Sequence, residues 1–187
     1  MQPTSDFSQQ AVPPQKRIKW AFLQLEFSIK LSRLFENREI DKESFDSEML
    51  VSSPEGRLFF PQSSFNTYED LILASQNVYS TSLGLSAIAL EKAYVDAGIL
   101  NDPSDRTPKG DLRSFVYMLR CAFAHDLMYP KWKAKSSYAR VFNLDLGELS
   151  RAVDVAALNG SHLELSDFGG MRTYLAIKDM VLTWLGS

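Results

Sequence analysis

The sequence predicts a mainly α protein, a helical bundle with small β-hairpins between the helices. Apolar residues recur at helical spacing over four stretches, and Gly, Pro and Asn turn signals flank short β-prone runs. With 187 residues and 45% hydrophobic content, the chain can form one good core. We therefore expect one domain over residues 15–187, preceded by a disordered tail over residues 1–14 that is rich in Gln, Ser and Pro.

The first helix is expected over Lys16–Asn37, where two adjacent apolar stripes run along the helix axis. One stripe comprises Ile18, Phe22, Leu25 and Ile29, and its neighbour comprises Trp20, Leu23, Phe27, Leu31 and Leu34. So broad an apolar surface implies contacts on two sides. We expect the aromatic residues of this helix to belong to the core.

A small hairpin is expected next, because Ser52-Ser53-Pro54-Glu55-Gly56 is a strong turn signal. Glu48–Val51 would pair with Arg57–Phe60 in this hairpin.

A long helix is expected to follow the hairpin. Thr67 and Asp70 resemble a capping box, and the helix that they open can run to Ala97, with Gly98 just past its end. Gly84 in its middle favours a bend or a close approach of another helix.

The most apolar helix is expected over Asp111–Asp126, with Asp111 as its cap, after a loop over Asn101–Gly110. One side of this helix faces a core through Leu112, Phe115, Val116, Leu119, Ala122 and Phe123. The opposite side is only mildly polar and carries Arg113, Ser114, Tyr117, Cys121 and Ala124, flanked by Arg120 and His125. A face so poor in charge is usually covered by another helix or another subunit.

A basic segment follows His125, since Leu127–Leu144 contains no acidic residue. Its cations Lys131, Lys133, Lys135 and Arg140 alternate with aromatic residues. The period-two spacing of the lysines is typical of one face of a strand, and we expect Arg140–Leu146 to be its partner strand.

The turn signal Asn159-Gly160 predicts a second hairpin between Val155–Leu158 and His162–Leu165. A last helix is then expected from Ser166 or Asp167 to Trp184.

Composition excludes several kinds of protein. The net charge of −3 argues against general nucleic-acid binding, so that any such role must be local. A single cysteine excludes an internal disulfide and a cysteine metal cluster, and two histidines are too few for an ordinary metal site. No apolar run is long enough to span a membrane. We expect a soluble, cytoplasmic protein with no metal and no cofactor.

The segment from Leu119 to Asp126 resembles the HEPN superfamily. The motif of that family is an Arg, four to six residues and a His near the end of a core helix of a four- or five-helix bundle, and Arg120 and His125 match it with four residues between them. The resemblance implies a homodimer through the Asp111–Asp126 helix. It also implies metal-independent endoribonuclease activity, often that of a toxin paired with a nucleotidyltransferase-like antitoxin. Many members have Asn, Asp or His after the Arg, whereas this chain has Cys121.

The predicted chemistry assigns a role to each candidate residue. His125 suits general acid or base catalysis, with its symmetry mate in the complementary role, and Arg120 suits the phosphate oxygens of RNA. Tyr117 would orient a phosphate or support Arg120. The other residues assigned to substrate binding are Arg113, Lys131, Trp132, Lys133 and Lys135, with the Trp132 ring stacked on a base.

Each candidate also has a plainer interpretation. Arg120 would be a surface cation paired with Glu91 or Asp126, and His125 a helix-end residue near the last carbonyls. The lysines would form a solvated strand face, and Cys121 would be a small buried hydrophobic residue. A second functional hypothesis therefore stands beside the enzyme: a HEPN-like dimer that binds RNA, a nucleotide or a protein without chemistry.

Overall fold

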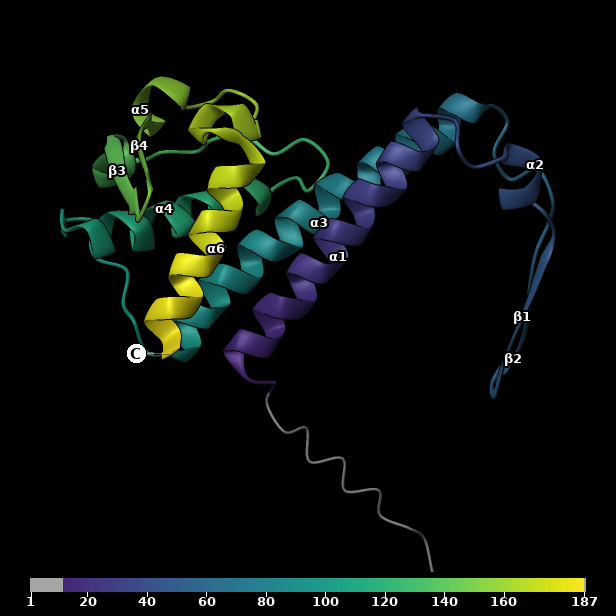
Figure 1. Cartoon of the computed structure of the whole chain (residues 1–187), viewed down its shortest axis with the longest axis horizontal. Coiled ribbons are helices and arrows are strands. Elements are labelled where there is room, and N and C mark those ends of the chain that lie inside the picture. Colours follow the sequence, from purple (N-terminus) through teal and green to yellow (C-terminus); the bar gives the residue numbers. More distant parts are fainter. Residues whose placement is uncertain (1–11, 187) are drawn as a thin grey trace, which may run out of the picture.

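The computed structural model describes residues 12–186, and these residues confirm the mainly helical fold with two small antiparallel hairpins (Figure 1). The four main helices are α1 (Pro14–Glu36), α3 (Tyr68–Asp96), α4 (Pro108–Phe123) and α6 (Gly170–Gly186). Short helices are α2 (Lys42–Phe45) and α5 (Val155–Leu158). One hairpin joins β1 (Met49–Ser53) to β2 (Gly56–Phe60), and the other joins β3 (Val141–Leu146) to β4 (Leu149–Asp154). The predicted tail over residues 1–14 falls almost wholly outside the described residues.

The long helices α1 and α3 lie side by side along most of their length (Figure 1). The capping box that opens α3 is confirmed: the Asp70 backbone N–H donates to Thr67 Oγ1 at 3.2 Å, and the Thr67 N–H donates to Asp70 Oδ2 at 2.8 Å. Gly98, with φ of +71°, lies just past the end of α3, as expected of a C′ glycine.

At Gly84, α3 packs closely against the end of α4 and the residues just after it. A Cβ atom at Gly84 would lie 2.6 Å from Leu127 Cδ2 and 3.0 Å from Phe123 Cδ1. Of the two predicted roles for this glycine, close packing is therefore the one that the structure supports.

Helix α4 begins earlier than predicted, at Pro108. Thr107 is its cap, because the Thr107 hydroxyl accepts a hydrogen bond from the Gly110 N–H at 3.1 Å and Pro108 suits the first helical position. Asp111 instead ties α4 to the second hairpin: its carboxylate pairs with Arg140 and accepts from the Asn143 N–H at 2.8 Å. The helix ends at Phe123, so His125 lies just beyond it.

The predicted pairing of Lys131–Lys135 with Arg140–Leu146 is wrong. Strand β3 pairs with β4 through a tight turn at Gly147, which has φ of +77°. Closing this short loop costs less chain entropy than closing a longer one, so the nearest strand becomes the partner. The Lys131–Lys135 segment runs extended beside residues 160–163 instead, and the Trp132 N–H donates to the Ser161 carbonyl at 3.0 Å.

The prediction of a hairpin around Asn159-Gly160 is also wrong. Val155–Leu158 is the helix α5, because the Asp154 carboxylate caps it by accepting from the Ala157 N–H at 3.0 Å. The last helix begins at Gly170, later than predicted. A short 3-10 helix over Leu165–Phe168 and a left-handed Gly169 come first.

Two apolar surfaces remain exposed in the described part of the chain. The β1–β2 hairpin forms where it was predicted, with Met49–Ser53 paired to Gly56–Phe60 and Val51 opposite Leu58, but all ten of its residues are exposed. On α1 the first stripe is mostly buried, whereas Trp20 is 50% exposed and Phe27 is 62% exposed. The prediction that these two rings belong to the core is therefore wrong.

Candidate functional site

The end of α4 and the segment after it enclose a hollow of about 670 Å³. Its lining residues are Tyr117, Met118, Arg120, Cys121, Ala124, His125, Lys133, Lys135, Ser136, Ser137 and Tyr138. Five residues that the sequence assigned to one site therefore meet here, although they come from two separate segments. They are Tyr117, Arg120, His125, Lys133 and Lys135.

The hollow is positively charged. Three permanent cations line it, and its lining residues, all within the described part of the chain, include no carboxylate. Arg120 and His125 are both exposed, and neither has a hydrogen bond or ion pair with another residue in the range 12–186. Such a surface attracts anions.

The plainer interpretation of Arg120 fails because both expected acids are engaged elsewhere. Glu91 pairs with Arg113. Asp126 Oδ1 accepts from the backbone N–H groups of Met128, at 2.8 Å, and Tyr129, at 2.9 Å. The Arg120 guanidinium is thus left to face the hollow.

The two lysines of the hollow lie on the exposed side of a segment whose residues are alternately buried and exposed. Lys133 and Lys135 are exposed because Trp132 and Ala134 point into the core, which is the period-two pattern expected of an extended segment. The Ala134 N–H donates to the Asn159 side chain at 2.8 Å and holds this segment in place. The predicted spacing of the lysines on one face is therefore right, although their predicted strand partner is not.

Two tyrosines form one wall of the hollow. The rings of Tyr117 and Tyr138 stack with centroids 5.1 Å apart, and the Tyr138 hydroxyl accepts from Asn101 Nδ2 at 2.9 Å. The neighbouring Cys121 thiol raises the pKa of Tyr117, and burial raises the pKa of Tyr138. Both hydroxyls thus stay protonated at neutral pH, and a phenol O–H can donate a hydrogen bond to an anion.

Arg113 is not available for substrate, which corrects its predicted role. Its side chain is buried and grips Glu91 with two hydrogen bonds, one of them 3.0 Å from Arg113 Nη2 to Glu91 Oε1. Its guanidinium also lies 4.9 Å from the ring centre of Tyr94. Arg113 holds α4 to α3.

Trp132 is likewise in the core, so the prediction that it stacks on a base is wrong. Its ring has no exposed surface, and its Nε1 donates to Asp167 Oδ2 at 2.7 Å. The alternation of Lys and Trp in the sequence showed that they occupy opposite faces, but not which face is buried.

Lys131 lies in a smaller hollow next to the first. This second hollow, of about 200 Å³, shares His125 and Lys133 with the larger one and adds Ala122, Asp126, Tyr129 and Lys131. Tyr129 stacks on His162 with ring centroids 4.4 Å apart. Sequence reasoning missed Tyr138, Ser136 and Ser137 as site residues; only the absence of acids in this segment pointed to them.

The described residues include no group of three or more His, Cys, Asp or Glu side chains placed to hold a metal ion. None of the helices within 12–186 combines the length and apolar character needed to cross a membrane.

The chain was compared with protein-family models, curated proteins and solved structures, and none of them matches it. The likeness to the HEPN superfamily therefore rests on the Arg120 to His125 spacing and the surrounding helix.

Proposed function

We propose that the hollow at the end of α4 binds RNA through its phosphates, and that the protein is a metal-independent endoribonuclease of the HEPN type. One observation carries the proposal. Arg120 and His125 are both exposed and unpaired within the described chain, and they line one carboxylate-free hollow together with Lys133 and Lys135.

The residues suit cleavage by the neighbouring 2′-hydroxyl. The 2′-oxygen attacks phosphorus, the bond from phosphorus to the 5′-oxygen breaks, and the products carry a 2′,3′-cyclic phosphate and a 5′-hydroxyl. Arg120 stabilises the charge on the phosphoryl oxygens, and the protonated Tyr117 hydroxyl donates to them. His125 takes the proton from the 2′-hydroxyl or supplies one to the leaving oxygen.

A second subunit would complete this chemistry. Each chain places one histidine in the larger hollow, whereas the reaction needs a base and an acid. The proposed homodimer through the Asp111–Asp126 helix would supply the other histidine. The surface available for such a seam near the motif is narrow and comprises Tyr117, Arg120 and Cys121 of α4 with Ala124 just past its end. A nucleotidyltransferase-like antitoxin is the partner that this proposal suggests.

Binding without cleavage is the second candidate. It is favoured by Cys121, a half-buried thiol beside Tyr117 at the position where many HEPN members carry Asn, Asp or His. In this version the same four cationic or titratable groups hold RNA, a nucleotide or an anionic partner, and no bond is broken.

The test is an RNA cleavage assay in EDTA with the purified full chain. Cleavage is expected for RNA but not for the DNA of the same sequence, and Arg120→Ala and His125→Ala should each reduce it to background. Matched controls are Arg106→Ala, an exposed arginine in the loop before α4, and His162→Ala, the other histidine. Both controls should retain activity.

The outcomes separate the two candidates. RNA that binds but stays intact, with binding lost in Arg120→Ala, supports the binding protein. Cleavage that survives His125→Ala, or that requires a divalent metal, contradicts the proposed enzyme.

A further inference from the structure

The β1–β2 hairpin has apolar side chains on both of its faces, and no residue within the described range 12–186 covers them. Its six large apolar side chains are Met49, Leu50, Val51, Leu58, Phe59 and Phe60, each between 42% and 59% exposed. Met49, Val51, Leu58 and Phe60 share one face, and Leu50 and Phe59 share the other. An isolated two-stranded hairpin is marginal in water, so this one needs a partner surface.

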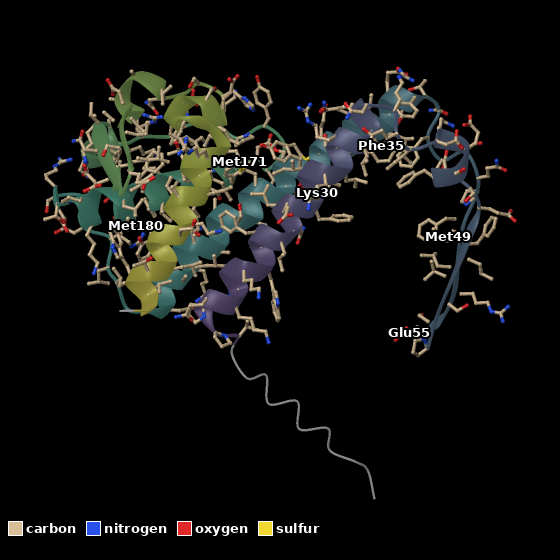
Figure 2. The ribbon with its side chains drawn as sticks, viewed as in Figure 1. Lys30, Phe35, Met49, Glu55, Met171 and Met180 are labelled. Carbon is tan, nitrogen blue, oxygen red and sulfur yellow. The ribbon has the colours of Figure 1, made fainter. Side chains whose placement is uncertain are left out.

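The root of the hairpin is built rigidly, which makes it an arm and not a loose loop. The buried Asp46 carboxylate accepts from the backbone N–H groups of Ser64 and Phe65, both at 2.9 Å, and so clamps the two ends of the hairpin together. Phe45 packs between Phe35 of α1, at 5.0 Å, and Phe65, at 6.3 Å. Figure 2 shows the arm standing away from the helices, with Met49 near its root and Glu55 at its tip.

A groove with largely apolar walls runs between α1 and α3. It has a volume of about 420 Å³ and is lined by Arg17, Trp20, Ala21, Gln24, Leu85, Ile88, Ala89 and Lys92. Trp20 is half exposed, and Leu85 and Ile88 are each 39% exposed. This groove and the arm are the two uncovered apolar surfaces described above, and each copy of the chain carries both.

The charges of the two surfaces are complementary. Residues 39–60, which form the arm and its root, hold six acidic residues against Lys42 and Arg57. Residues 14–30 of α1 hold Lys16, Arg17, Lys19 and Lys30 against the single acid Glu26. The groove itself is lined by Arg17 and Lys92, which both pair with the single carboxylate of Asp96, so that these three groups leave one net positive charge. An apolar arm with an acidic root therefore meets an apolar groove of net positive charge.

We propose that the β1–β2 arm packs into the α1–α3 groove of a second copy of this chain, and that two copies do so reciprocally. A two-fold arrangement fills both grooves and covers both arms, which leaves no open end for further growth. By one contact it also covers Trp20 of the exposed α1 stripe and the apolar side chains of the hairpin. This interface is distinct from the α4 seam and does not rest on the proposed function.

The first test is the mass of the full chain in solution by light scattering. Leu58→Asp, at a side chain that is 59% exposed within its own chain, should halve the mass of the parent assembly and leave the helix content by circular dichroism unchanged. The mass halves whether or not the α4 seam also forms, because only the arm contact is removed. Leu100→Asp is the matched control, since Leu100 is 87% exposed and lies outside both the arm and the groove. It should keep the parent mass.

The second test locates the contact by cross-linking. In a Cys121→Ser background, Leu50→Cys on the arm and Trp20→Cys in the groove are prepared as separate proteins. Mixed under mild oxidation, they should form disulfide-linked heterodimers, and Leu50→Cys mixed with Leu100→Cys should not.

Several results would overturn the inference. They are a parent that is monomeric at tens of micromolar, an assembly whose mass is unchanged by Leu58→Asp, and cross-linking through Ala124→Cys, just past the end of α4, without cross-linking of arm to groove. Binding of a monomeric parent to phosphatidylcholine vesicles would also overturn it, because the arm would then be a membrane contact. RNA cleavage or binding can persist or fail in any of these cases, so the two proposals stand or fall separately.

Discussion

At the scale of single residues, two buried tyrosines differ in one hydrogen bond. The Tyr174 hydroxyl is 2.7 Å from Ser86 Oγ, whereas the Tyr94 hydroxyl is buried without a hydrogen-bond partner among the described residues. Tyr94→Phe should leave the free energy of unfolding unchanged or raise it by about 1 kcal/mol, because it removes an unsatisfied polar group. Tyr174→Phe should lower it by about 1 kcal/mol.

Urea unfolding of the two variants measures this difference, and each serves as the control for the other. Equal losses of stability in both variants would show that the Tyr94 hydroxyl is satisfied.

The sequence predicted which residues lie on the same side of α4, but it did not predict which of their side chains are buried. Arg113 and Arg120 lie seven positions apart on α4, which turns them to nearly the same side of the helix, and the sequence assigned both to the site. The acid that buries Arg113 is Glu91, on another helix and 22 residues away in sequence. Local spacing carries no information about such a partner, so the sequence could not separate the structural arginine from the exposed one.

At the scale of the elements, the contact of α3 with α4 depends on the absence of a side chain at Gly84. Gly84→Leu should lower the free energy of unfolding by about 1–3 kcal/mol, because the new side chain collides with Leu127 and Phe123. Leu127→Ala vacates part of that space, so the cost of Gly84→Leu should be smaller in the Leu127→Ala background. Urea unfolding of the parent, the two single variants and the double variant measures these free energies. If the losses of the two single variants simply add in the double variant, the close packing is contradicted.

The helices could be predicted because their signals are local. Capping at Thr67, the stripe of Leu112 to Phe123 and the turn at Ser52–Gly56 each lie within one element, and the structure confirms all three. Strand pairing is a contact between segments, and it failed where the partners are distant. Lys131 meets His162, 31 positions on, and no spacing rule pointed to that contact.

At the scale of the whole molecule, the sequence did not predict which apolar surfaces would stay exposed. Periodicity predicted two apolar stripes on α1, but a stripe covered by the same chain and one covered by another copy have the same pattern. The sequence could not predict the hollow either. It forms where the end of α4 lies against the segment after Lys131, and its positive charge comes from Arg120 of α4 together with Lys133 and Lys135 of that segment.

The most direct test of the central claim is proton NMR of the histidine rings during titration with a short 2′-O-methyl RNA, which can bind but cannot be cleaved. The chain has only His125 and His162, so variants at each assign the two signals. The His125 signal should shift as RNA fills the hollow, and Arg120→Ala should abolish the shift. A His125 signal that stays fixed at saturating RNA would contradict the proposal that this hollow binds RNA.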